Sequence, residues 1–316
     1  MEHLRRWLMV GVAAVLAVVV AAMGTQPTLA ENSKHKAEKQ QQSIENSVDW
    51  GQVSSIIGKS GKMQEGPVYE IDLPRTDQTI TVQGTRMNPS LDEGEIYFVP
   101  LGGGQVVMHG EFAVLMSEVP GVEAALRDSG IEIAADHHHL LNEQPQLVYL
   151  HFSARGDALQ IARALKVGLS QSATPTTETP DQTNLAGLPT SQLDSIIGDQ
   201  GKAMDGMYQY SIEREDTISD MGIELPSASG VEVMLNVQPM GGNSAAVTGE
   251  MPLLASEVNP VISALEHNGI AVTAVHNHML GEQPRLFYLH FWATGNATDI
   301  AKGLKAALDQ VNIKKS

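Results

Sequence analysis

Apolar residues recur at helical spacing in the last stretch of each half of the chain. Ile161, Leu165 and Leu169 fall on one helical face behind Asp157, a residue type that favours a helix N-cap. The same spacing follows Asn296 near the C-terminus. Proline near the start and glycine just past the end predict two further helices, over residues 120–129 and 260–268.

Between these helices the pattern changes to that of β-strands. Strand-like runs cover residues 131–139 and 146–153, and again residues 270–278 and 285–292. Each half therefore reads as a helix, several strands, a helix, two strands and a final helix. This order predicts an α+β fold built as a tandem duplication of a helix-flanked, mainly antiparallel sheet domain.

The strand pairs carry a motif that occurs twice. It reads HxHxxxEQP, followed three residues later by YLHF, and its second copy begins 139 residues after the first. Each copy is of a size that can bury its own core, so we expect the two to fold as separable domains. The predicted divisions are a signal peptide (1–30), a polar tether (31–48), a first repeat domain (49–170), a Thr/Pro-rich linker (171–188) and a second repeat domain (189–314).

The register of the predicted strand pairs decides where the histidines point. Side chains alternate across a strand, so both histidines of each HxH lie on the same face. In the second copy, the register that keeps Leu289 on the helix-covered face is favoured. It places His276 opposite Tyr288. His290 then lies opposite Ala274, and three imidazoles of each copy share one face.

Three imidazoles within one cross-strand diagonal, ~7–8 Å, can reach a common point. With a nearby glutamate they form a set suited to a divalent transition metal such as Zn, Mn, Fe, Ni or Cu. The predicted metal ligands are His137, His139, Glu143 and His151 in the first copy, and His276, His278, Glu282 and His290 in the second. The alternative is that these histidines are packed and hydrogen-bonded without a ligand.

Aromatic residues on the same face are candidates for contact with a small ligand. Tyr149 and Tyr288 recur in both copies, whereas Trp292 has Ser153 as its counterpart. An indole beside a polar cluster offers a stacking surface, so we expect the second copy to dominate recognition of any organic ligand. The alternative is that Trp292 belongs to the hydrophobic core.

Composition narrows the function classes. The net charge of −17 disfavours nucleic acid as a partner, and the absence of cysteine excludes disulfides and thiolate metal sites. Arg5 and Arg6 precede an apolar run over residues 8–23, and small residues end this segment at Ala30. The pattern predicts a cleaved export signal, without stable membrane insertion of the mature chain.

The second copy also resembles a known family. Its stretch VTAVHNHMLGEQPRLFYLHFWATGNATDIAKGLKAAL, and more loosely residues 131–169, resemble the LppY/LpqO family of exported bacterial proteins of uncharacterised function. The resemblance implies an extracytoplasmic bacterial protein and supplies no reaction. Some relatives are lipoproteins, whereas this chain has no cysteine to carry a lipid.

The sequence thus predicts an exported binding protein with a His/Glu site in each repeat for a transition-metal ion. A metal-dependent enzyme would need the same ligands together with an open coordination position, so the alternative remains open. A structural protein of the cell envelope with packed histidines is the third hypothesis.

Overall fold

The structure is a computed structural model that describes residues 43–45, 47–177, 185 and 187–315. The predicted signal peptide and most of the tether lie outside these residues, as do residues 178–184 and 186 of the linker. Among the described residues, no helix combines the length and the apolar character needed to cross a membrane.

Both copies contain the predicted elements in the predicted order. The first copy comprises α2 (Trp50–Ile57), β1 (Lys62–Gln64), β2 (Val68–Leu73), β3 (Thr81–Val82), β4 (Thr85–Arg86), β5 (Gly94–Gly102), β6 (Gln105–Leu115), α3 (Val119–Asp128), β7 (Glu132–His137), β8 (Glu143–Gln144), β9 (Leu147–Asp157) and α4 (Ala158–Leu169). The second comprises α5 (Thr190–Ile197), β10 (Lys202–Met204), β11 (Met207–Ile212), β12 (Ser219–Asp220), β13 (Ile223–Glu224), β14 (Val233–Gly241), β15 (Ser244–Leu254), α6 (Val258–His267), β16 (Ala271–His276), β17 (Leu286–Asn296) and α7 (Ala297–Leu308).

Each copy is built around one six-stranded antiparallel sheet. The strand orders are β1-β2-β5-β6-β9-β7 and β10-β11-β14-β15-β17-β16, which are equivalent between the copies. Asp157 and Asn296 cap the last helix of each copy, because their side chains accept hydrogen bonds from backbone amides of the first turn. The α+β fold and the tandem duplication predicted from the sequence are confirmed.

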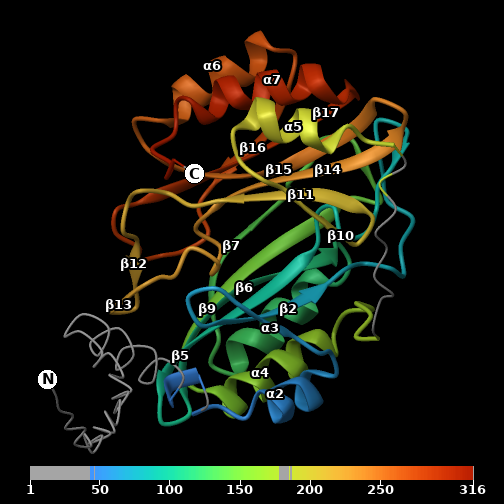
Figure 1. Cartoon of the computed structure of the whole chain (residues 1–316). Helices are drawn as coiled ribbons and strands as arrows, with labels where there is room; N and C mark the ends of the chain where they lie inside the picture. The colour runs from blue at the N-terminus through green and yellow to red at the C-terminus, as the bar shows by residue number, and fades with distance from the viewer. Residues whose placement is uncertain (1–42, 46, 178–184, 186, 316) are drawn as a thin grey trace, which may run out of the picture. The chain divides into compact units, whose positions relative to one another are not determined.

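The helices of each copy cover one face of its sheet (Figure 1). In the second copy α5, α6 and α7 pack on that face, and in the first copy α2, α3 and α4 do the same. The apolar side chains of the covered face form the main core of each copy. Leu289 and Phe291 belong to that core in the second copy, as the predicted register requires.

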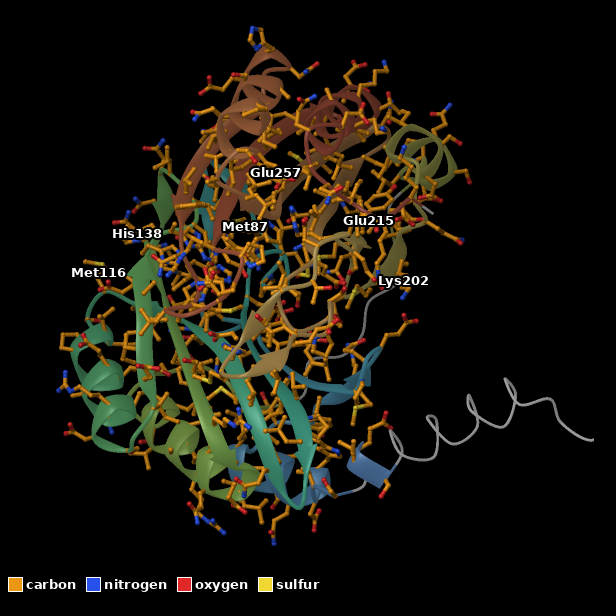
Figure 2. All side chains as sticks on the ribbon, turned by 90° about the vertical axis from the view of Figure 1, so that its left-hand side faces the viewer. Met87, Met116, His138, Lys202, Glu215 and Glu257 are labelled. Carbon is orange, nitrogen blue, oxygen red and sulfur yellow. The ribbon has the colours of Figure 1, made fainter. Side chains whose placement is uncertain are left out.

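The uncovered faces of the two sheets pack against each other. One apolar cluster draws on both copies and includes Tyr149 from the first and Trp292 from the second. Asn236 of β14 donates a hydrogen bond to the carbonyl of Leu91 at 3.0 Å, and Arg155 of β9 donates to the carbonyl of Met221. Nitrogen and oxygen atoms gather between the ribbons of the two copies (Figure 2). The two copies therefore belong to one compact unit.

Candidate metal centre

The pairing of β16 with β17 places the histidines of the second copy as predicted. His276 is opposite Tyr288, and Ala274 is opposite His290. In the first copy, β7 and β9 pair in the equivalent register, with His137 opposite Tyr149. The second histidine of each HxH, which is His139 or His278, lies two residues past the end of its strand. Three imidazoles per copy therefore lie on the face that is turned toward the other copy.

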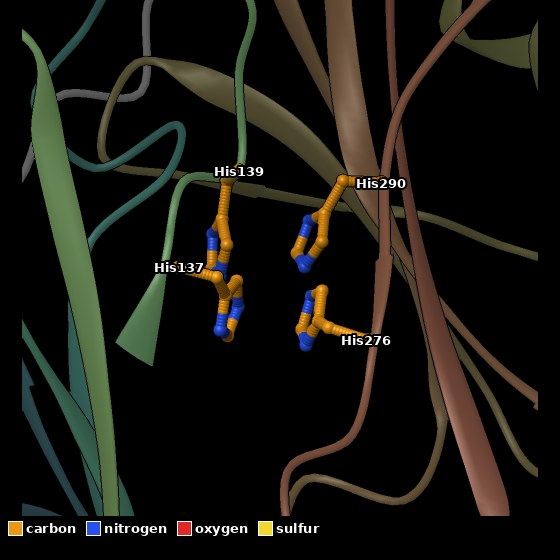
Figure 3. Close-up of side chains that lie close together, drawn as sticks. All are labelled: His137, His139, His276 and His290. Atoms are coloured by element: carbon orange, nitrogen blue, oxygen red, sulfur yellow. The ribbon is translucent and has the colours of Figure 1, made fainter. Parts of the chain in front are cut away.

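The six imidazoles form one cluster. His137 lies on His276, its counterpart in the other copy, with ring centroids 3.4 Å apart. The second histidine of each HxH stacks on the histidine of the YLHF segment in the other copy. These two distances are 3.7 Å for His139 with His290 and 3.9 Å for His151 with His278. Figure 3 shows two imidazoles from each copy facing one another. The pairing implies a pseudo-twofold axis between His137 and His276.

The sequence pattern gave no indication that the two copies would share one centre. The prediction of a His/Glu site in each repeat rested on neighbouring strands of the same copy. The facing sheets bring both sets together instead, and the two tyrosines extend the stack at its ends. Tyr149 lies 3.5 Å from His139, and Tyr288 lies 3.5 Å from His278, measured between ring centroids.

Glutamates from the neighbouring strand complete the cluster. Glu111 of β6 is opposite His151, and Glu250 of β15 is opposite His290. The Oε2 atom of Glu111 lies 2.7 Å from the Nε2 atom of His151 and 3.7 Å from that of His139. The Oε2 atom of Glu250 lies 3.1 Å from the Nε2 atom of His278 and 3.5 Å from that of His290.

These short contacts are not hydrogen bonds. The Nε2 atoms of the four histidines beside the two glutamates are buried and have no hydrogen-bond partner among the described residues. Buried polar atoms are normally hydrogen-bonded, so unpartnered ones require an explanation. Nitrogen and oxygen atoms that converge without the geometry of hydrogen bonds match the arrangement that ligands of one cation adopt.

The glutamates predicted from the EQP motif lie elsewhere. The carboxylate of Glu143 accepts a hydrogen bond from the backbone amide of Leu147 at 2.9 Å, and that of Glu282 accepts one from Leu286 at 3.1 Å. Both side chains are buried, and neither belongs to a group of candidate ligands whose atoms lie within 4.8 Å of one another. They hold the turn before β9 and β17, whereas Glu111 and Glu250 lie beside the imidazoles as candidate ligands.

Two equivalent ligand groups result, each confined to one copy. Among the described residues, the ligand atoms of Glu111, His139 and His151 lie within 4.8 Å of one another, as do those of Glu250, His278 and His290. We call these groups the first and the second triad. Two imidazoles with one carboxylate match the ligand set of non-haem iron sites and of catalytic zinc sites.

Two groups of imidazoles from both copies are also compact, and they compete with the triads. The first consists of His137, His139, His276 and His290, and the second of His151, His276 and His278. Each group takes one residue from each triad, so neither can be filled at the same time as both triads. A buried divalent cation is stabilised by an anionic ligand, which both imidazole groups lack and each triad supplies. The triads are therefore the better pair of sites.

Ring spacing within each copy also fits shared coordination. With metal–nitrogen bonds of ~2.1 Å, two imidazoles on one ion have centroids about 4.5–6.5 Å apart. The centroids of His139 and His151 are 6.2 Å apart, and His137 lies 4.8 Å from His151 and 5.1 Å from His139. The cross-copy pairs at 3.4–3.9 Å are too close for this arrangement: two of them are stacked, and the rings of His137 and His276 are tilted by 30°.

Burial keeps the imidazoles neutral. Burial, together with the neighbouring imidazoles, lowers the pKa of His137 to about 3, and burial lowers that of His276 to about 4. The pKa values of the four triad histidines are lowered as well, chiefly by burial. A neutral imidazole keeps the lone pair that a metal requires. Burial conversely raises the pKa values of Glu111 and Glu250.

A cavity of about 60 Å³ lies against both triads, and all six triad residues line it. Three further carboxyl groups, those of Asp92, Glu93 and Glu95, complete an acidic wall, and no lysine or arginine lines the cavity. Burial raises the pKa of each of these three groups, to about 8 for Glu95. With no lysine or arginine beside them, a bound cation would favour the ionised forms of these five carboxyl groups.

The predicted aromatic ligand contacts are buried side chains. Tyr149 and Tyr288 are fully buried and do not line the cavity, although each stacks on a triad histidine. Trp292 lies on the histidine face as predicted, but it is 2% exposed and packs in the apolar cluster shared by the copies. It does not line the cavity either, so its place matches the core alternative.

Sequence reasoning missed Glu111 and Glu250 as candidate ligands, although one signal could have found them. The dipeptide Gly-Glu occurs at residues 110–111 and again 139 residues later, with the same offset as the histidine motif. A β-carbon at Gly110 would lie 2.6 Å from the carbonyl oxygen of Glu95, and one at Gly249 would lie 2.1 Å from that of Met234. The glycines allow close approach of β5 and β14 beside the glutamates.

Comparison with known proteins agrees with the duplication. A family model described as Domain of Unknown Function (DUF1259) matches residues 51–171 and again residues 191–310. The chain belongs to this family. Each match covers one structural copy, and the description of the family assigns no activity. A comparison with curated proteins gives no significant match.

Some solved structures show a weak likeness. The trimeric bacterial microcompartment shell protein PduB is 14% identical over 81% of this chain and 96% of its own, with a TM-score of 0.20. EtuB from Clostridium kluyveri is 9% identical over 79% and 88% of the two chains, with a TM-score of 0.21. The double ringed trimeric shell protein MSM0271 from the RMM microcompartment is 11% identical over 67% and 85%, with a TM-score of 0.19. At such TM-scores the likeness carries no argument about function.

Proposed function

We propose that this chain is an exported protein that binds two divalent transition-metal ions, one at each triad of a shared centre. The observation that carries the proposal is the convergence of unpartnered lone pairs. In each copy two buried Nε2 atoms and a carboxylate come within 4.8 Å of one another, beside a cavity that no basic side chain lines. Export rests on the apolar segment that follows Arg5 and Arg6.

The ligand chemistry selects the class of cation. Imidazole nitrogens suit Zn, Fe, Ni and Cu, carboxylates extend the range to Mn, and thiolates that would favour softer ions are absent. Mg²⁺ and Ca²⁺ prefer oxygen ligands and are poor candidates for a triad with two nitrogens. The proposal therefore names a first-row divalent transition metal.

Metal content of the purified, untagged mature protein tests the proposal. We expect two equivalents of metal after loading with Zn²⁺ and dialysis, and one equivalent in each of the variants His151→Ala and His290→Ala. The control is His267→Ala, because that imidazole is exposed on α6 and bonds only to the carbonyl of Ser263. Wild-type protein that binds no Zn²⁺ at micromolar concentration would leave the six histidines with a structural role.

One observation favours a metal-dependent enzyme as the second candidate. The cavity has room for several atoms of a ligand, and both triads border it with only three protein ligands each. Catalytic metal sites keep an open position in this way. Addition of azide to the Co²⁺-loaded protein tests the idea, because an anion at an open position shifts the visible absorption of the metal. An unchanged spectrum would favour storage or transport of the ion over catalysis.

A further inference from the structure

The two triads have the same ligands but different surroundings. Asp92 stands beside the first triad, and Val231 occupies the equivalent position of the second copy, 139 residues later. Glu95 is opposite Glu111 in the pairing of β5 with β6. In the pairing of β14 with β15, Met234 is opposite Glu250. Two carboxyl groups of the first copy are thus replaced by apolar side chains in the second.

Asp92 orients a ligand of the first triad. Its Oδ1 atom lies 2.9 Å from the Nδ1 atom of His139, so the imidazole donates its proton there and keeps the lone pair on Nε2. The hydroxyl of Tyr149 donates to the backbone carbonyl of Asp92 at 3.0 Å and fixes the segment. The side chain of Asp92 is 10% exposed, which strengthens the contact. A valine at this position cannot accept the proton of an imidazole.

Glu95 places a second carboxyl group beside the first triad. Its carboxyl group lies on the strand next to Glu111, lines the cavity and accepts a hydrogen bond from the hydroxyl of Tyr97. The equivalent of Tyr97 in the second copy is Asn236, which instead donates to the carbonyl of Leu91. Within its own copy, a cation in the first triad therefore has a second carboxyl group in the neighbouring strand, whereas a cation in the second triad has the thioether of Met234. Besides burial, Glu95 and Asp92 also raise the pKa of Glu250, so the direct contact of Asp92 with His139 carries the difference between the triads.

On the basis of the proposed metal binding, we propose that the two ions are bound unequally, with the first triad as the tight site and the second triad as the exchangeable one. Asp92 positions His139 for the tight site, and Glu95 contributes a carboxyl group beside Glu111. Outer-shell carboxylates of this kind contribute about 10- to 100-fold to metal affinity. The centre therefore retains one ion over a range of metal concentration in which the other exchanges.

Calorimetric titration of the metal-free mature chain with Zn²⁺ tests the inequality. We expect two steps whose dissociation constants differ about 10- to 100-fold. The variant His290→Ala should keep the tight step, and His151→Ala should keep the weak one. These two variants remove equivalent ligands, so they identify which triad fills first. If both retain a step of the same affinity, the inference is wrong.

Replacing the residues beside one triad with those beside the other then identifies the cause of the difference in affinity. We expect Asp92→Val with Glu95→Met to weaken the tight step until it merges with the weak one, and Val231→Asp to tighten the weak step. Asp128→Val is the control for loss of charge, because that carboxylate is exposed on the end of α3. The visible spectrum of Co²⁺ in the first triad should change in Asp92→Val, which a distant structural effect would not produce.

The outcomes separate this inference from the proposed function. A wild-type chain without bound Zn²⁺ contradicts the metal proposal itself. Two ions of equal affinity leave the metal proposal intact and contradict only the inequality. If the double variant does not fold, the comparison of His151→Ala with His290→Ala still decides which triad is tight.

Discussion

Replacing Glu111 by Gln should remove one metal ion without unfolding the protein. The Oε2 atom of Glu111 lies 2.7 Å from the Nε2 atom of His151, so it is the charged member of the first triad. Removing one partner of a buried charge pair costs about 3–5 kcal/mol, which corresponds to a loss of ~10²–10⁴-fold in affinity. The metal-free variant should be at least as stable as the wild type, because burial disfavours the ionised Glu111 carboxylate and raises its pKa.

Glu143→Gln is the matched comparison, since the sequence motif had indicated that residue as the ligand. Glu143 accepts a backbone hydrogen bond from Leu147 at 2.9 Å, and an amide can replace the carboxylate as acceptor. We expect two bound ions and a loss of only about 1 kcal/mol in the free energy of unfolding, or ~2–4 °C in Tm. Elemental analysis after Zn²⁺ loading and urea denaturation of the metal-free protein measure the two quantities.

The reverse result would refute the placement of the ligands. If Glu143→Gln lost one equivalent of metal while Glu111→Gln retained both, the carboxylate of the EQP motif would be the ligand. The assignment of Glu111 to the first metal site would then be wrong, although the six imidazoles would still form one cluster. The pair Glu250→Gln and Glu282→Gln repeats the test independently in the second copy.

Three further predictions follow from the packing and the charges. Trp292→Ala should cost about 3–5 kcal/mol in urea denaturation and leave Zn²⁺ affinity unchanged, because the indole fills the apolar cluster between the copies and does not line the cavity; a change in affinity without loss of stability would restore Trp292 to the site. The metal-free chain should be most stable at about pH 5–6 in urea denaturation. The folded-state pKa of His276 is lowered to about 4, so stability is lost as the pH falls below ~6.5. The folded-state pKa of Glu95 is raised to about 8, so stability is lost as the pH rises above ~4.5. Each group changes the free energy of unfolding by up to about 1.4 kcal/mol per pH unit, and a flat profile would contradict the burial of these groups. Residues 187–315 expressed alone should form a homodimer in light scattering, because the face that packs on the first copy is otherwise exposed, and a stable monomer would show that this face needs no partner.

Local sequence signals predicted much of each copy. The N-caps Asp157 and Asn296 and the pairing of His276 with Tyr288 each depend on residues close in the chain, where turn, cap and alternation patterns act directly. The histidine face was predicted correctly because one register alone keeps Leu289 in the core. Short-range patterns therefore fixed which side chains share a face.

The ligand carboxylates and the partner of that face depend on distant residues. Glu111 reaches His151 through the pairing of β6 with β9, 40 positions along the chain, whereas Glu143 stands inside the motif and was chosen for its proximity. Nothing in the spacing of one copy shows that its histidine face packs on the other copy. An isolated His-rich face reads equally as a solvated surface, so the shared centre follows only from the packing of the two sheets.

The pseudo-twofold arrangement explains why the two motifs retain the same spacing. The ring of His137 lies against that of its own counterpart His276, and each remaining imidazole stacks on the imidazole of a different motif position in the other copy. A shift of one histidine along its strand would therefore separate it from the carboxylate of its own copy and from its stacking partner in the other. Residues outside the stack are free of this double requirement. Asp92 and Glu95 could accordingly differ from Val231 and Met234 while the triads stayed alike, which leaves two equivalent ligand sets in unequal surroundings.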